Sequence, residues 1–332
     1  MKFGIFDQLP CSEEQIPSQR YRDVVSQAKL ADELGFDQVW LAELHFNPRF
    51  SMMPAPLLVA SAIAQATKNI RIGTAVNLLP LHQPIRLAEE IATLDQLSEG
   101  RAIFGIGRGA QPRQYQGYGI DIDEGRGRFL EALSLIIHAW SHEEARFNGL
   151  FYNVGEVNVV PKPYQLPNPP IYIAANSADT FGMVGELGHN LLVAPLVVSR
   201  EGALSGLEAF KSAAGLHSFN TNINVNIPVY VTEDDTKIKN GYQFTVNNYL
   251  TTLQQNRSNA ASRAANLDYE TVYDDYAAIG TPEQVVSKLR FFQQLFAPQE
   301  FMGWFNIGGM LPNDEVANSM KLFAEKVIPQ FK

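Results

Sequence analysis

The sequence is poor in cysteine, in basic residues and in long apolar runs. Its one cysteine, Cys11, has no second cysteine with which to form an internal disulfide, and no metal-binding motif includes it. The 26 basic residues are outnumbered by 35 acidic ones, so the net charge of −9 argues against binding to nucleic acid or to an anionic membrane surface. Apolar runs such as 191–198 are far shorter than the roughly 20 residues of a membrane span.

Two kinds of sequence signal are also missing. The chain begins with the strand-like segment 3–6 rather than with the basic, apolar and cleavage regions of a signal peptide. No G-x-G-x-x-G turn and no Walker loop occurs, so neither motif predicts a dinucleotide or nucleoside triphosphate site. We therefore expect a cytoplasmic protein, and its apolar content of 45% is ordinary for one with a sizeable core.

Short apolar segments alternate with longer helical patterns through most of the chain, which is typical of parallel βα units. Helices are expected at 21–34, 86–97 and 282–295, because glycine and proline mark their ends. Strands are expected at 2–6, 38–41, 70–76, 102–106, 171–175, 191–194, 226–231 and 301–305. This order predicts an α/β fold, a (β/α)8 TIM barrel that forms one domain over residues 1–332. The alternative is a doubly wound open sheet divided near residue 165.

A barrel of this type needs about 250 residues, so about 80 residues must lie in insertions. A Gly- and Arg-rich loop at 107–125 follows the fourth strand, and 145–165 should include a hairpin before a proline-rich segment. A polar stretch at 254–268 follows the seventh strand and lacks apolar periodicity. We expect this stretch to form a lid over the barrel mouth.

Glycines and hydroxyl groups at two strand ends suggest anion binding. Gly107 would let a ligand approach the main chain closely, and Arg108 would supply a cation for a phosphate or carboxylate. The alternative for Arg108 is an ion pair with an acidic residue of the following loop, at Asp121, Asp123 or Glu124. Asn176, Ser177 and Thr180 lie at the expected start of a helix, where a second anion site would form. Two such sites suggest a phosphorylated cofactor.

Polar side chains also follow the second and third strands, at the barrel end where chemistry takes place. Glu43 and His45 place a carboxylate and an imidazole there, so His45 could act as a general acid or base that Glu43 orients. The alternative is a structural hydrogen bond that caps the strand. Small residues at 75–76 could form a wall against a flat ring whose heteroatoms bond Asn77, or the segment could be a simple strand end.

The other histidines and acids favour structural roles. His138 and His142 are four residues apart near a helix end, but no glutamate of a metal-binding motif lies between them, and no metal is expected. His82 lies in a proline-containing turn, which is a sufficient explanation for it. Asp95 and Glu99 should fix the end of a helix.

The order and spacing of several motifs resemble those of the bacterial luciferase-like, flavin-dependent monooxygenases. The resemblance covers nearly the whole chain. Its landmarks are WLAELHF at 40–46, IGTAV at 72–76, EEIATLDQLSEGR at 89–101, FGIGRG at 104–109, AANSADT at 174–180, GTPEQ at 280–284 and FNIGG at 305–309. The resemblance implies a (β/α)8 barrel, usually dimeric, that binds reduced FMN at the carboxyl ends of its strands.

The same resemblance implies roles for individual residues. Arg108 matches an arginine near the flavin phosphate, and the segment with Asn176, Ser177 and Thr180 matches one that also grips this phosphate. Ala75–Val76 matches a non-proline cis peptide beside the isoalloxazine ring, so we expect a cis bond at this position.

The sequence departs from the light-emitting members at the glutamate motif. Those members have two successive histidines after the glutamate, and the first is catalytic; here Leu44 takes its place and only His45 remains. Asn176 replaces an acidic residue of the luciferase catalytic subunit, and Ala194 replaces a serine. These changes argue against light emission and leave flavin binding as the expectation.

The resemblance thus implies an FMN-dependent monooxygenase that takes reduced FMN from a separate flavin reductase. It would use O2 to oxygenate a small organic substrate, and it would be a homodimer. Three alternatives remain. They are a hydride-transfer oxidoreductase of the same fold using FMN or a deazaflavin, a flavin-binding but non-catalytic subunit, and a barrel hydrolase that binds a phosphorylated substrate directly.

Overall fold

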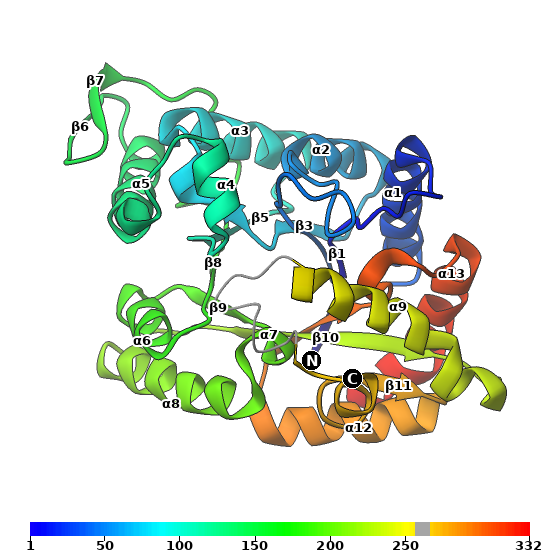
Figure 1. Cartoon of the computed structure of the whole chain (residues 1–332). Helices are drawn as coiled ribbons and strands as arrows, with labels where there is room; N and C mark the ends of the chain where they lie inside the picture. The colour runs from blue at the N-terminus through cyan, green and yellow to red at the C-terminus, as the bar shows by residue number, and fades with distance from the viewer. Residues whose placement is uncertain (256–265) are drawn as a thin grey trace.

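Eight parallel strands close into a barrel in the computed structural model, which describes residues 1–255 and 266–332 (Figure 1). The order around the barrel is β12-β1-β2-β3-β5-β8-β9-β10, and β10 pairs with both β9 and β12. These strands are β1 (Lys2–Asp7), β2 (Gln38–Leu41), β3 (Arg71–Thr74), β5 (Ala102–Gly107), β8 (Ile171–Ala174), β9 (Asn190–Val193), β10 (Ile223–Val231) and β12 (Glu300–Trp304). Each overlaps a predicted strand, so the barrel is confirmed and the open doubly wound sheet is wrong.

Helices surround the barrel on its outside (Figure 1). They are α1 (Pro17–Glu33), α2 (Pro56–Ala66), α3 (Pro84–Leu97), α4 (Pro112–Gly117), α5 (Gly125–Ser141), α6 (Ala178–Leu187), α7 (Pro195–Val198), α8 (Arg200–Leu216), α9 (Asp235–Gln255), α11 (Tyr269–Thr271), α12 (Pro282–Phe296) and α13 (Asn313–Leu322). Proline begins several of them, because the first helical residue has no intrahelical use for its N–H group. The helices predicted at 21–34, 86–97 and 282–295 are α1, α3 and α12.

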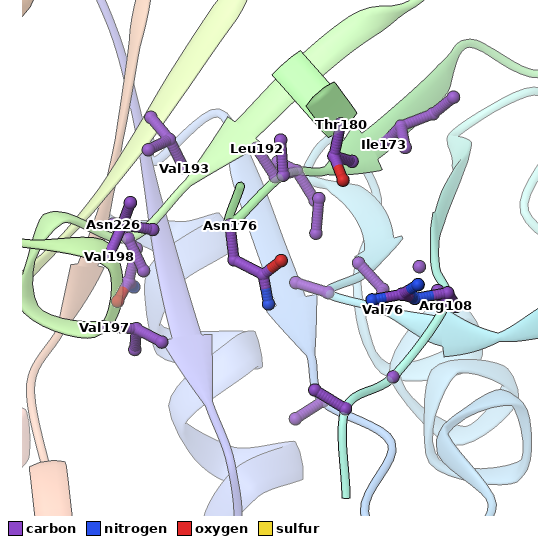
Figure 2. A pocket seen from close by; sticks show the side chains of 18 of the residues that line it. Val76, Arg108, Ile173, Asn176, Thr180, Leu192, Val193, Val197, Val198 and Asn226 are labelled. Carbon is purple, nitrogen blue, oxygen red and sulfur yellow. The ribbon is translucent and has the colours of Figure 1, made fainter. Parts of the chain in front are cut away.

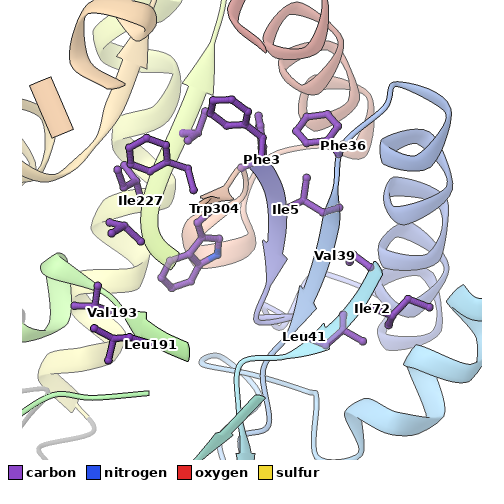
Figure 3. Packing of buried hydrophobic residues seen from close by; sticks show 14 of the residues in the cluster. Phe3, Ile5, Phe36, Val39, Leu41, Ile72, Leu191, Val193, Ile227 and Trp304 are labelled. Carbon is purple, nitrogen blue, oxygen red and sulfur yellow. The ribbon is translucent and has the colours of Figure 1, made fainter. Parts of the chain in front are cut away.

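The alternation of side chains along each strand separates two apolar layers. One side of the strands packs against the helices, and Figure 3 shows Phe3, Ile5 and Val39 within this outer cluster. The other side fills the barrel with a smaller cluster that contains Trp40, Ile103, Tyr172, Leu192 and Met302. Burying an apolar side chain of this size contributes about 1.5–3 kcal/mol. Both faces of each strand are therefore buried, as expected for a parallel barrel.

The amino-terminal end of the barrel interior is closed by a buried polar network. Glu300 is fully buried and accepts hydrogen bonds from the Tyr172 hydroxyl at 3.0 Å, from Gln38 Nε2 at 3.0 Å and from Asn224 Nδ2 at 3.2 Å. Burial, together with the neighbouring Glu300 carboxylate, raises the pKa of Tyr172. Because this network fills the amino-terminal end of the barrel interior, a ligand must enter from the opposite end, at the carboxyl ends of the strands.

Close packing between β3 and β5 shapes the carboxyl end. A Cβ atom on Gly105 would lie 1.6 Å from the Thr74 carbonyl oxygen, so glycine is needed here. Thr74 Oγ1 donates a 2.6 Å hydrogen bond to the Gly105 carbonyl. Just after Thr74, the peptide bond between Ala75 and Val76 is cis, as predicted. The chain then forms β4 (Asn77–Leu78), which pairs with the end of β5.

The insertions lie largely where the sequence placed them. The segment after the fourth barrel strand includes α4, and the predicted hairpin is the antiparallel pair β6 (Ala145–Asn148) and β7 (Asn153–Val157). The sequence missed β11 (Ala278–Gly280), which pairs with β10 beside the barrel. Residues 256–265 of the predicted lid lie outside the described residues, so the lid stays a prediction.

In the part of the chain that the structure describes, no helix is both long and apolar enough to cross a membrane. No group of three or more histidine, cysteine, aspartate or glutamate side chains there could hold a metal ion.

Candidate functional site

A cavity of about 550 Å³ opens at the carboxyl ends of the barrel strands. Its wall includes Ala75 and Val76 after β3, Arg108 after β5, Asn176 after β8 and Asn226 of β10. In Figure 2, Arg108 and Thr180 lie on one side of this pocket, Asn226 and Val198 lie on the other, and Asn176 points between them. The cavity therefore spans the barrel mouth and is large enough for a cofactor-sized ligand.

Two arginines mark one end of the cavity. Arg108 follows β5, and Arg126 lies in the first turn of α5. Both are exposed, and neither forms an ion pair with a residue in the described part of the chain. Glu124, one of the three acids expected as an alternative partner of Arg108, is 2.8 Å from Arg128 instead. The cavity thus has two unneutralised cations at one end.

Two hydroxyl groups face the same end of the cavity. Ser177 is the N-cap residue of α6, and its side chain makes no capping hydrogen bond. Its Oγ lies 2.8 Å from Thr180 Oγ1, and both residues line the cavity. Hydroxyls at a helix amino terminus and two arginines at the same end of the cavity supply the donors that a phosphate dianion requires, and Asp179 is an acidic residue of the described lining at this end. The residues present therefore fit the phosphate of FMN.

Beside the arginine end of the cavity, Ala75, Val76 and Gly107 form a shelf that suits a flat ring. A Cβ atom on Gly107 would lie 2.5 Å from Val76 Cγ2, so glycine keeps the space between β5 and the Ala75–Val76 peptide open. Ala174 and Leu192 continue the apolar surface across the barrel. A ring system attached to the phosphate could lie on this shelf over the mouth of the barrel.

The carboxylate of Glu43, buried in the cavity wall, accepts hydrogen bonds from four residues. Glu43 accepts hydrogen bonds from His45 Nε2 at 2.9 Å and from His82 Nε2 at 2.8 and 2.9 Å. It also accepts from Asn77 Nδ2 at 3.0 Å and from the Leu78 backbone N–H at 3.1 Å. Glu43 is only 2% exposed, so these donors replace the water that a carboxylate otherwise needs.

The surroundings of Glu43 determine its ionisation. Burial raises the pKa of Glu43, but the hydrogen bonds from His45 and His82, the charge of His82 and the Asn77 amide outweigh burial and lower the pKa to about 2. Burial lowers the pKa of His82, but its hydrogen bond and charge attraction to Glu43 outweigh that effect, so the pKa of His82 is raised. Glu43 is therefore an anion near neutral pH, and His82 is its partner.

His45 connects this carboxylate to the protein surface. Its Nε2 meets Glu43, and its Nδ1 lies 3.2 Å from the hydroxyl of Tyr118, which is 46% exposed. The two rings meet edge-on at a centroid distance of 5.0 Å. A hydrogen-bonded path thus runs from the cavity wall at Glu43 through His45 to Tyr118.

Some predicted residues occupy places that the sequence did not indicate. His45 does not line the cavity, because both ring nitrogens are used by Glu43 and Tyr118. Asn77 was expected to bond a ligand ring, but its amide group donates to Glu43 and the residue does not line the cavity. The sequence explained His82 only as a turn residue and missed the hydrogen bonds between its side chain and Glu43.

The remaining predicted residues come together. The cavity wall contains Glu43, Ala75, Val76, Gly107, Arg108, Asn176, Ser177 and Thr180. The sequence reasoning missed Arg126, although its position between two glycines at 125 and 127 could have drawn attention to it. It also missed the far end of the cavity, whose residues are spread over β1, β10, β12 and α9.

Comparison with known proteins agrees with this geometry. The model of the family described as luciferase-like monooxygenase matches residues 1–299. The chain is 32% identical over 216 residues, 64% of the chain and 59% of the relative, to the oxygenase component of a flavin-dependent trigonelline monooxygenase from Acinetobacter baylyi. Across three curated relatives, the chain spans 55–62% of their length.

Solved structures match over the full chain. The monooxygenase RslO1 from Streptomyces bottropensis superposes with a TM-score of 0.91 and 28% identity, and 100% of both chains is covered. The oxygenating constituent of 3,6-diketocamphane monooxygenase from Pseudomonas putida, in complex with FMN, gives 0.86 at 19% identity over 99% of this chain and 98% of that one. The second likeness bears on the fold alone. From the family match, the chain belongs to the luciferase-like monooxygenases.

Proposed function

We propose that this protein is the oxygenase of a two-component, FMN-dependent monooxygenase. It would receive reduced FMN from a separate flavin reductase and use O2 to oxygenate a small organic substrate. The observation that carries the proposal is that Arg108 and Arg126, both without ion pairs to described residues, line the same cavity as the paired Ser177 and Thr180 hydroxyls. The FMN in the Pseudomonas putida structure of the same fold supports the choice of cofactor.

The phosphate of FMN would be held by these two arginines and two hydroxyls, with Asn176 beside them. The ring would lie on the shelf formed by Gly107, Ala75 and Val76. When bound in its reduced form, FMN would supply the electrons for the activation of O2. The apolar remainder of the wall would keep water away from the reacting groups.

The Glu43 cluster would control protons at the cavity wall. Glu43 faces the cavity as a carboxylate, and His45 links it to Tyr118 at the surface. We infer that Glu43, whose oxygens are occupied by its hydrogen-bond donors, positions His45, and that His45 is the group that exchanges protons with the surface through Tyr118. Replacing His45 with Gln should therefore keep FMN affinity but move the pH profile of turnover. An unchanged profile would contradict the inferred role.

We also propose that the chain forms a homodimer and works with a separate flavin reductase. The homodimer, the reductase partner and the cytoplasmic location follow from the family resemblance and the composition, and they stay predictions. The oxygenase component from Acinetobacter baylyi, a relative that by its name is one component of a larger enzyme, supports the reductase partner.

The test measures binding of oxidised FMN to the full chain by quenching of flavin fluorescence. A charge-assisted hydrogen bond contributes about 1.5–3 kcal/mol, so Arg108→Gln should weaken FMN binding by about 10- to 100-fold. Arg113→Gln is the matched control, because Arg113 is an exposed arginine of the same loop and does not line the cavity. Equal affinities of the two variants, or no affinity of the wild-type chain for FMN, would refute the proposal.

A second measurement separates the alternatives. Product formation from reduced FMN should require O2, and one oxygen atom from labelled O2 should appear in the product. Turnover without O2 would instead favour hydride transfer with FMN or a deazaflavin. FMN binding without turnover of any substrate would favour the non-catalytic subunit.

A further inference from the structure

The end of the cavity opposite Arg108 has aromatic walls. It is built by β1, β10, β12 and α9, which lie across the barrel from β5 and β8. Tyr249 of α9 stacks on Phe50 with a centroid distance of 5.8 Å and 17° between the rings. Trp304 at the end of β12 meets Tyr249 edge-on at 4.9 Å and Phe6 edge-on at 5.0 Å. These rings form a continuous surface that suits a flat ligand.

Three polar side chains in the same region have hydrogen-bonding capacity to spare. Gln8 and Tyr249 are each 4% exposed and line the cavity, and neither the Gln8 amide nor the Tyr249 hydroxyl has a partner in the described part of the chain. Asn226 is 9% exposed and uses Nδ2 to donate to the Met302 carbonyl at 3.1 Å, which leaves its Oδ1 without a described partner.

None of these atoms is enclosed by protein; the unpartnered atoms that are fully enclosed belong to other residues. The three groups therefore face the cavity. Water can hydrate these groups in the free protein, so a ligand that displaces this water must supply hydrogen bonds in its place. The Tyr249 hydroxyl and the Gln8 amide can donate to a ligand oxygen, and Asn226 can accept from a ligand hydroxyl.

The charges on the described wall lie elsewhere. Arg108, Arg126 and Asp179 belong to the phosphate end, on or beside β5, α5 and α6. Glu43 is the remaining charged residue among those that line the cavity, and its oxygens are already occupied by the donors described above. A charged substrate at the aromatic end would lose its hydration without gaining a counter-charge.

We propose that this end of the cavity binds a neutral aromatic carbonyl compound. Its ring lies against Phe6, Phe50 and Trp304, and its carbonyl oxygen accepts hydrogen bonds from Tyr249 and Gln8. The inference rests on the proposed function, because it assigns the arginine end of the same cavity to FMN. It names the class of substrate that the monooxygenase takes.

Small probes test the assignment on the full chain, with and without saturating oxidised FMN. Acetophenone carries a ring and a carbonyl group, ethylbenzene has nearly the same shape without the oxygen, and benzoate carries a charge. Isothermal titration should show acetophenone binding at least about 5-fold more tightly than the other two compounds. No detectable acetophenone binding, or equal affinities for acetophenone and ethylbenzene, would overturn the inference.

Two variants locate the binding. Tyr249→Phe keeps the ring and removes the hydroxyl, so acetophenone affinity should fall about 3- to 10-fold while ethylbenzene affinity is unchanged. Tyr164→Phe is the control, because Tyr164 is 56% exposed and does not line the cavity. A loss in Tyr249→Phe no larger than in the control would overturn the inference, provided that circular dichroism shows both variants folded; an unfolded Tyr249→Phe is replaced by Gln8→Leu, with the same expected result.

The FMN titration and the acetophenone titration test separate claims. If acetophenone selectivity persists while FMN fails to bind, the proposed function fails and the neutral aromatic site stands. If FMN binds but the selectivity is absent, the assignment of the substrate end fails alone.

Discussion

Replacing Glu43 with Gln should destabilise the protein strongly, although the substitution replaces only one carboxylate oxygen with an amide NH2 group. The carboxylate accepts from His45 and His82 through one oxygen and from Asn77, His82 and the Leu78 N–H through the other. With its NH2 group on the Asn77 side, glutamine would face the fixed donors Asn77 Nδ2 and Leu78 N–H. On the other side, the NH2 group would face His45 and His82, which can accept only as neutral rings, so the charge attraction to His82 would be lost.

Two lines of reasoning give a similar magnitude. The pKa of Glu43 is lowered from its ordinary 4.5 to about 2, which corresponds to about 3 kcal/mol of stabilisation of the charged form. Breaking a buried charged pair by removing one partner costs about 3–5 kcal/mol. We therefore expect the free energy of unfolding to fall by about 3 kcal/mol, a large part of the 5–15 kcal/mol that is typical of a folded protein.

Urea unfolding followed by tryptophan fluorescence measures this loss. Glu90→Gln is the control, because Glu90 forms an exposed ion pair with Arg86 that is worth about 0–1 kcal/mol. The reasoning is refuted if the two variants lose the same stability at pH 6.

The pH dependence of the loss follows from the direction of each pKa shift. The folded pKa of Glu43 lies below its ordinary value, so its contribution is present above about pH 4.5 and disappears as the pH falls toward 2. The folded pKa of His82 is raised, so its contribution is complete below about pH 6.5 and disappears as the pH rises through that raised pKa. The difference between wild type and Glu43→Gln should therefore be largest between about pH 4.5 and 6.5. A difference that keeps growing below pH 4 would contradict this account.

Two further substitutions test the packing that positions the site. Gly105→Ala places a Cβ atom 1.6 Å from the Thr74 carbonyl oxygen, so we expect a loss of more than about 3 kcal/mol by urea unfolding, whereas Gly155→Ala, with open space around it, should cost little. Glu131 accepts hydrogen bonds from three successive backbone N–H groups of the β6–β7 turn. Glu131→Ala should therefore speed proteolysis of that turn relative to Glu144→Ala; equal cleavage rates would show that the carboxylate does not hold it.

The barrel was predictable because its signal is local and repeated. Each strand has a buried apolar run, and each of the three predicted helices has a proline or glycine at an end, so every unit carries its own pattern. The strand β11 was missed because three residues, Ala278–Gly280, are too short to show a period. The phosphate end was predictable for a similar reason, since Gly107 and Arg108 are adjacent in the sequence, as are Asn176 and Ser177.

The Glu43 cluster and the far end of the cavity were not predictable in this way. Glu43 and His82 are 39 residues apart. No local pattern predicts that a histidine in the turn after the third strand contacts a carboxylate that follows the second strand. Tyr249 and Phe50 meet across almost 200 residues of chain. Such contacts depend on strand pairing, which sets the neighbours of each strand end, β2 beside β3 for Glu43 and His82.

The sequence by itself determined which segments become strands and helices, and it drew attention to Gly107 and Arg108 at a strand end that lines the cavity. Only the tertiary structure decided that His45 turns away from the cavity, that the Asn77 amide donates to Glu43 and that three neutral polar groups of the far wall face the cavity. The physical reason is that the direction of a side chain is fixed by its hydrogen-bond partners. Those partners meet only when strands distant in the sequence pair, β2 with β3 for the Glu43 cluster and the first strand with the last for the far wall.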